Sequence, residues 1–137
     1  MRQRGKLNLI NRTAYDWIKT YQKNYKMDRW HFPEIIPAKT SVEIDIEWTD
    51  EQKIITRSNN RGAANYMLFG SRDRCFQIHA STKNNHNCDL EIRFVNLKTS
   101  KHPIGSILNL DWEGNGNVNF ALSGTADEFE VSNRKKR

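Results

Sequence analysis

The sequence predicts an all-β protein, an antiparallel β-sandwich of about eight short strands in a single domain. Apolar and polar residues alternate through most of the chain, which is the pattern of strands with one buried face. Gly, Asn and Pro separate the alternating segments at short intervals, as is typical of sandwiches and barrels. The chain has 137 residues, the size of one ordinary domain.

The alternating segments follow one another along the whole chain. The clearest runs from residue 42 to residue 48, where four apolar residues alternate with three carboxylates. Residues 7–9 begin another strand, and residues 15–17 fit its continuation after Asn11, Arg12 and Thr13. The later candidates are residues 64–68, 76–80, 90–94, 108–112, 118–122 and a weaker 129–131. Two irregular stretches, residues 21–39 and 49–62, interrupt the strands, and long loops in a compact domain are often functional.

The register of the later strands follows from placing apolar residues opposite apolar residues, because a slip of one residue turns every side chain to the other face. Residues 64–94 then form a three-stranded meander, and residues 108–122 form a hairpin with a three-residue turn at 114–116. The predicted partners are Phe76 with Phe94, Cys75 with Val95, Cys88 with Thr82, Tyr66 with Ile78, and Trp112 with Val118.

The formal net charge of +6 is concentrated at the ends of the chain. Seven of the 22 Lys and Arg residues lie in residues 1–6 and 134–137, which we expect to be two frayed basic tails. The domain between them, residues 7–133, carries a net charge of −1. We therefore do not expect a nucleic-acid partner.

We expect a soluble protein that is cytoplasmic or released by a non-classical route, because no signal peptide and no transmembrane segment can be identified. Asn11, Arg12 and Thr13 match a glycosylation sequon, which is incidental without an export signal.

Few residues carry a pattern typical of catalysis or metal binding. Cys75, His79, His86 and Cys88 lie close in sequence, but four residues along one strand separate the first two by about 13 Å, too far to share a zinc ion. The acidic row from Glu43 to Glu47 predicts a solvated face with basic neighbours such as Arg93. We expect no catalytic residues, no metal and no cofactor, and hence no enzyme.

Residues 21–32 mix aromatic and basic side chains in a predicted loop. Such a loop suits a membrane surface, a single-stranded nucleic acid or a sugar, unless its rings fold back onto the sandwich. The predicted ligand-binding residues are Tyr21, Tyr25, Lys26, Arg29, Trp30 and Phe32.

The order of several segments resembles that of the small aegerolysin-like β-sandwich family. These segments are LNLINRTAYDW, IPAKTSVEIDIEW, NYMLFG and CFQIHA, and the resemblance spans residues 7–124. It implies a lipid-binding, cytolysin-like toxin that acts with a larger protein partner. It also implies that Trp17 and Trp30 contact the membrane.

Three functions follow from these observations. The first is a non-enzymatic module that binds membrane lipid, with Trp30 inserted at the depth of the headgroups and Lys26 and Arg29 beside them. The second is a lectin whose rings stack on a sugar. The third is a structural or self-assembling protein, for which a homo-oligomer is expected.

Overall fold

The protein is a single-domain β-sandwich of two sheets. The computed structural model describes residues 2–49, 60–70, 74–82, 88–96, 104–113, 116–123 and 128–134, and all regular secondary structure in these ranges is strand. No helix that could span a membrane occurs among these residues. The strands are β1 (Arg2–Asn11), β2 (Trp17–Tyr25), β3 (Ile35–Ile36), β4 (Ser41–Thr49), β5 (Arg61–Leu68), β6 (Arg74–Thr82), β7 (Cys88–Asn96), β8 (Ile104–Trp112), β9 (Asn117–Ser123) and β10 (Glu128–Arg134).

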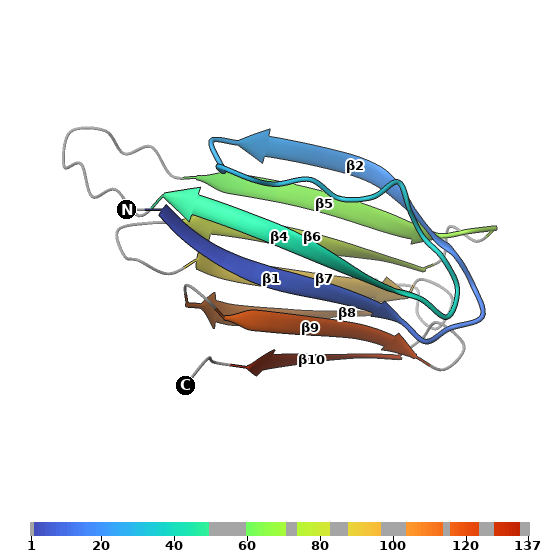
Figure 1. Cartoon of the computed structure of the whole chain (residues 1–137). Helices are drawn as coiled ribbons and strands as arrows, with labels where there is room; N and C mark the ends of the chain where they lie inside the picture. The colour runs from blue at the N-terminus through green and yellow to red at the C-terminus, as the bar shows by residue number, and fades with distance from the viewer. Residues whose placement is uncertain are drawn as a thin grey trace.

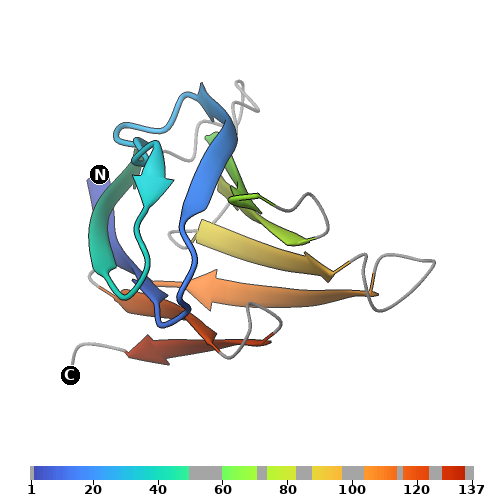
Figure 2. The ribbon, with the colours of Figure 1, turned by 90° about the vertical axis from the view of Figure 1, so that its right-hand side faces the viewer.

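The two sheets face each other across the core. One has four strands in the order β10-β9-β1-β4, and the other has six in the order β3-β2-β5-β6-β7-β8. In Figure 1 the four-stranded sheet lies in front, and Figure 2 shows the sandwich from one end. The segment of residues 26–40, here called the crossover segment, contains β3 and carries the chain from β2 to β4.

The core consists of the apolar side chains that the alternation predicts to face inward. Trp17, Trp48 and Trp112 are fully buried, and the rings of Trp48 and Trp112 lie 5.4 Å apart. Gly5 of β1 leaves space for one of them, because a Cβ there would lie 2.5 Å from Cζ2 of Trp112. Aromatic rings from both sheets therefore meet at the centre of the sandwich, as Phe76 of β6 and Phe120 of β9 do at 4.9 Å.

The predicted register is confirmed for the hairpin of β6 and β7 and is wrong for the hairpin of β5 and β6. In β6 and β7, Phe76 pairs with Phe94 and Cys75 with Val95, as the sequence predicts. In β5 and β6, however, Tyr66 pairs with Phe76 rather than with Ile78. A shift of two residues leaves every side chain on its own face, so the hydrophobic pattern cannot distinguish these two registers.

The predicted hairpin of residues 108–122 does not form. β8 pairs with β7, whereas β9 crosses to the other sheet and lies parallel to β1. The carbonyl of Gly116 secures the crossing, since it accepts hydrogen bonds from Nε1 of Trp112 at 3.1 Å and from the backbone N of Lys6 at 3.2 Å. The alternation reports which side chains are buried but not which sheet each strand joins.

The N-terminal basic residues are part of the sandwich. β1 begins at Arg2, so residues 2–6 form a paired strand rather than the predicted frayed tail. At the other end Arg134 closes β10, and residues 135–137 lie outside the described ranges.

The acidic row of β4 faces Lys6 of the same sheet and Arg29 of the crossover segment. Nζ of Lys6 lies 2.8 Å from Oε1 of Glu43, and this hydrogen bond raises the pKa of Lys6. Arg29 of the crossover segment lies 3.7 Å from Glu47. The predicted neighbour Arg93 is instead in the other sheet, beside Glu91.

Candidate functional site

The structure divides the predicted aromatic and basic segment between two environments. Tyr21 and Tyr25 belong to β2 rather than to a loop, and each is 48% exposed. Lys26 and Arg29 are exposed as well. Trp30 and Phe32 are the exceptions, since they are 4% and 0% exposed and their rings pack 4.8 Å apart.

Trp30 is buried because β5 leaves space for its ring. A Cβ on Gly62 would lie 2.5 Å from Cε2 of Trp30, so only glycine fits beneath the indole. Nε1 of Trp30 donates a hydrogen bond to the carbonyl of Ala63 at 3.1 Å. The ring therefore has its polar atom satisfied inside the protein, and the prediction that it inserts among headgroups is wrong for this fold.

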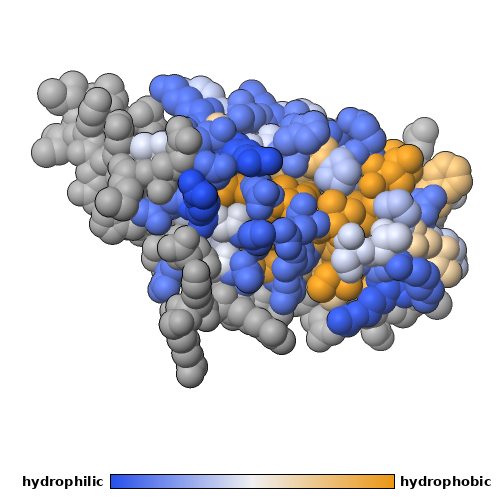
Figure 3. All heavy atoms as spheres, viewed as in Figure 1, coloured by the Kyte–Doolittle hydropathy of each residue, from blue (hydrophilic) through white to orange (hydrophobic). Residues whose placement is uncertain are grey.

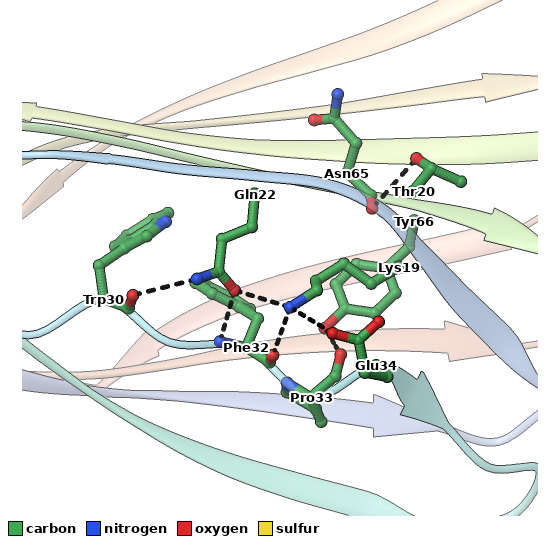
Figure 4. A network of polar contacts seen from close by, with 9 residues as sticks. All are labelled: Lys19, Thr20, Gln22, Trp30, Phe32, Pro33, Glu34, Asn65 and Tyr66. Carbon is green, nitrogen blue, oxygen red and sulfur yellow. Dashed lines mark hydrogen bonds and ion pairs between the residues drawn. The ribbon is translucent and has the colours of Figure 1, made fainter.

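Polar side chains of β2 hold the crossover segment in place (Figure 4). Gln22 accepts a hydrogen bond from the backbone N of Phe32 at 2.9 Å and donates one to the carbonyl of Trp30 at 3.4 Å. Nζ of Lys19 donates to the carbonyl of Phe32 at 2.9 Å and lies 3.1 Å from Oε1 of Glu34. Gln22 and Lys19 together therefore hold the backbone of Trp30 and Phe32, the two residues whose rings are buried.

Tyr66 of β5, which is buried in the core, is the third residue that holds the crossover segment. Its hydroxyl donates a hydrogen bond of 2.6 Å to the carbonyl of Pro33 (Figure 4). Burial, and to a smaller extent the carboxylate of Glu34, raises the pKa of this hydroxyl well above its ordinary value. The hydroxyl therefore remains a donor at neutral pH, and the crossover segment is a fixed part of the core.

A cluster of exposed apolar side chains occupies one end of the sandwich. Phe69, Ile35 and Tyr15 are 67%, 47% and 43% exposed, and we call these three residues the apolar end. All three lie close to Trp17 in the sheet. Tyr15 is two residues before Trp17 in the chain, and Phe69 directly follows Leu68, which pairs with Trp17. Ile35 pairs with Ile18, the residue after Trp17. Figure 3 shows hydrophobic residues gathered towards this end, where β1 and β5 end and β2 begins.

The loop that carries Tyr15 is held by a buried amide. Asn11 is 1% exposed, and its Nδ2 donates to the carbonyls of Tyr15, Ile36 and Pro37 at 2.8, 3.2 and 3.0 Å. Its Oδ1 accepts from the backbone N and the hydroxyl of Thr13. These hydrogen bonds tie the loop of Tyr15 to the crossover segment, and the sequon asparagine is buried in the folded chain.

Basic residues, a turn and the exposed carboxylate of Glu34 border the apolar end. Arg12 and Lys39 are exposed, and Nζ of Lys39 donates to the carbonyl of Arg12 at 2.9 Å. Phe69 stands in a turn with Gly70, whose φ of 81° is a left-handed conformation that glycine adopts without strain. The backbone N of Phe69 donates to the carbonyl of Asp16 at 2.9 Å, which ties this turn to the loop of Tyr15.

Sequence reasoning missed the apolar end because its members come from three separate segments. Phe69 is adjacent to a glycine after an alternating strand, and this is the one signal that could have identified it. Trp17, which the family resemblance implied as a membrane contact, is fully buried at this end.

The described residues contain no arrangement typical of a metal site. No group of three or more His, Cys, Asp and Glu side chains within the described ranges could hold an ion. Cys75 is partly buried, Cys88 is buried, and neither is part of a disulfide bond. His86, the fourth member of the sequence cluster, lies outside the described residues.

No protein-family model matches the chain, and the search of curated proteins finds no significant similarity.

Proposed function

We propose that the protein is a non-enzymatic β-sandwich module that binds membrane lipid through its apolar end. The observation that carries the proposal is the exposure of Phe69, Ile35 and Tyr15 together at one end. Soluble domains bury most large apolar side chains, and a group of exposed ones is typical of a surface that meets a membrane or another protein. The resemblance to aegerolysin-like proteins supports a membrane.

The chemistry of the surrounding residues favours a bilayer with anionic lipid. Aromatic side chains such as those of Tyr15 and Phe69 suit the boundary between acyl chains and headgroups. Arg12 and Lys39 are exposed beside them, and a basic residue near an anionic surface contributes about 1 kcal/mol. The surface therefore combines an apolar patch with cations at its border.

The size of the patch predicts reversible binding. Burying the exposed parts of three side chains contributes about 3 to 4 kcal/mol, since full burial of one contributes about 1.5 to 3 kcal/mol. With two cations the total is about 5 to 6 kcal/mol, which corresponds to affinity between millimolar and micromolar. Such a module gains stable attachment from several copies or from a larger protein partner, as the resemblance implies.

Vesicle sedimentation tests the proposal. The protein should sediment with phosphatidylcholine vesicles that contain phosphatidylserine, and Phe69→Ser should weaken this binding about tenfold. Tyr25→Ser is a matched control, because it removes an aromatic side chain of similar exposure from the other end of β2. The proposal fails if the wild type stays in the supernatant at low salt, or if both variants lose binding equally.

A further inference from the structure

We propose that the outer face of β2 and β5 binds single-stranded nucleic acid. This is the face of the six-stranded sheet that points away from the core, and none of the residues that define it belongs to the apolar end. It is defined here by Tyr21, Lys23 and Tyr25 of β2 and by Arg61 and Asn65 of β5, and we call it the tyrosine face.

The register of the two strands places these residues in rows. Tyr21 pairs with Asn65, Lys23 with Ala63, and Tyr25 with Arg61. The two tyrosines are each 48% exposed and stand four residues apart, which is about 13 Å along a strand. Two half-exposed rings therefore lie in line along one face of the sheet.

Cations alternate with the rings. Lys23, Lys26 and Arg61 are exposed, and Nζ of Lys26 lies 5.4 Å from the centre of the Tyr25 ring. Lys26 has a φ of 64°, a left-handed conformation directly after β2. Its side chain therefore returns over Tyr25 instead of continuing along the strand.

The acidic residues of the same sheet face lie farther away. Asp89 and Glu91 are on β7, two strands beyond β5, and Arg93 lies 3.6 Å from Glu91. The described outer positions of β2 and β5 carry no carboxylate. The near-neutral charge of residues 7–133 consequently conceals a basic strip, which is why the sequence led us to expect no nucleic-acid partner.

The combination of exposed rings and cations on the tyrosine face indicates which class of ligand it binds. A neutral sugar needs a ring as a platform but no cations, and a sulfated sugar needs cations but no rings. A single-stranded nucleic acid uses both, because bases stack on aromatic side chains while phosphates follow the basic residues. The amide of Gln77 on β6, which pairs with Asn65 of β5, supplies donors and an acceptor for base edges.

Fluorescence anisotropy with labelled oligothymidylate and oligouridylate of about 15 nucleotides tests the proposal. Tyr21→Ala and Tyr25→Ala should each weaken binding about tenfold, since loss of one stacked base costs about 1 to 3 kcal/mol. Lys23→Gln should reduce the slope of log affinity against log salt by about 0.7.

The controls separate this surface from the apolar end. Tyr15→Ala, a change at a tyrosine of similar exposure, should leave the affinity for the oligonucleotides unchanged, and Phe69→Ser should do the same. Failure of vesicle binding would then leave this result intact, and failure here would leave vesicle binding intact. Thermal unfolding confirms that each variant is folded.

Two patterns of binding would overturn the proposal. One is binding of the oligonucleotides that is lost with salt but is unaffected by both tyrosine substitutions, which would show only general attraction to a polyanion. The other is tighter, salt-independent binding of neutral oligosaccharides that both substitutions abolish, which would assign the rings to a lectin. Absence of binding at low salt also refutes it.

Discussion

Replacing Gly62 by alanine tests the packing that buries Trp30. The added Cβ would lie 2.5 Å from Cε2 and 2.9 Å from Cε3 of the indole, closer than carbon atoms approach in folded proteins. Either the ring or β5 must move. Overpacking of this kind costs about 1 to 3 kcal/mol.

A displaced indole also loses its hydrogen bond to the carbonyl of Ala63, which contributes about 0.5 to 1.5 kcal/mol. We expect Gly62→Ala to lower the free energy of unfolding by about 3 kcal/mol. With a denaturant slope of about 2 kcal/mol per molar, the urea midpoint should fall by about 1.5 M. Tryptophan fluorescence and far-ultraviolet circular dichroism measure the transition.

A second substitution distinguishes the clash from a general effect on the strand. Trp30→Leu removes the ring that the new methyl group would meet, so Gly62→Ala should cost little in that background. The coupling energy from the double-mutant cycle should be about 2 kcal/mol. Gly70→Ala is the matched control, because its Cβ meets no atom within 4 Å and only its left-handed backbone is strained. Its cost should be the same in both backgrounds.

Two results would refute the reasoning. If Gly62→Ala changes the free energy of unfolding by less than about 0.5 kcal/mol, the indole is not packed against β5. If its cost is equal with and without Trp30, the glycine is required for another reason. Either result would restore Trp30 as a candidate for contact with a ligand.

Three further predictions concern buried polar groups. The free energy of unfolding should fall as pH rises above about 10, because the unfolded chain ionises at Tyr66 while burial holds the pKa of the folded hydroxyl higher; Tyr66→Phe should weaken this dependence in alkaline urea titrations. Cys75 should react slowly with a thiol reagent at pH 8, since burial raises the pKa of its thiol, and Cys88 should react only on unfolding, with one thiol rather than two modified in the native protein. Asn11→Ala should lower the free energy of unfolding by about 3 kcal/mol, because three backbone carbonyls lose a donor; a loss below 1 kcal/mol would contradict that role.

Much of the fold is predictable because alternation reports burial directly. The pairing of Phe76 with Phe94 agrees with it, since both rings face the core in this register. The crossing of β9 to the second sheet does not follow. It depends on the hydrogen bond from the backbone N of Lys6 to the carbonyl of Gly116 and on the space above Gly5 that the ring of Trp112 fills, and both contacts join residues more than a hundred positions apart.

The candidate surfaces were harder to predict because they depend on exposure rather than on composition. Residues 21–32 have a composition suited to ligand binding, but Trp30 and Phe32 are buried in the core instead. Gln22 and Lys19 cause this difference, since they hold the crossover segment against β2. A polar side chain that binds backbone groups inside a fold leaves no distinctive pattern in a single sequence.

One extra residue in β2 creates the tyrosine face. The pairing of β2 with β5 shifts between Lys19 and Tyr21, so Thr20 is an insertion in the strand. With strict alternation from the buried Trp17, residues 19, 21, 23 and 25 would all point into the core. The bulge reverses the alternation after Lys19, so Tyr21, Lys23 and Tyr25 face outward while Gln22 faces the crossover segment. The same irregularity therefore explains both the exposure of the two tyrosines and the anchoring that buries Trp30.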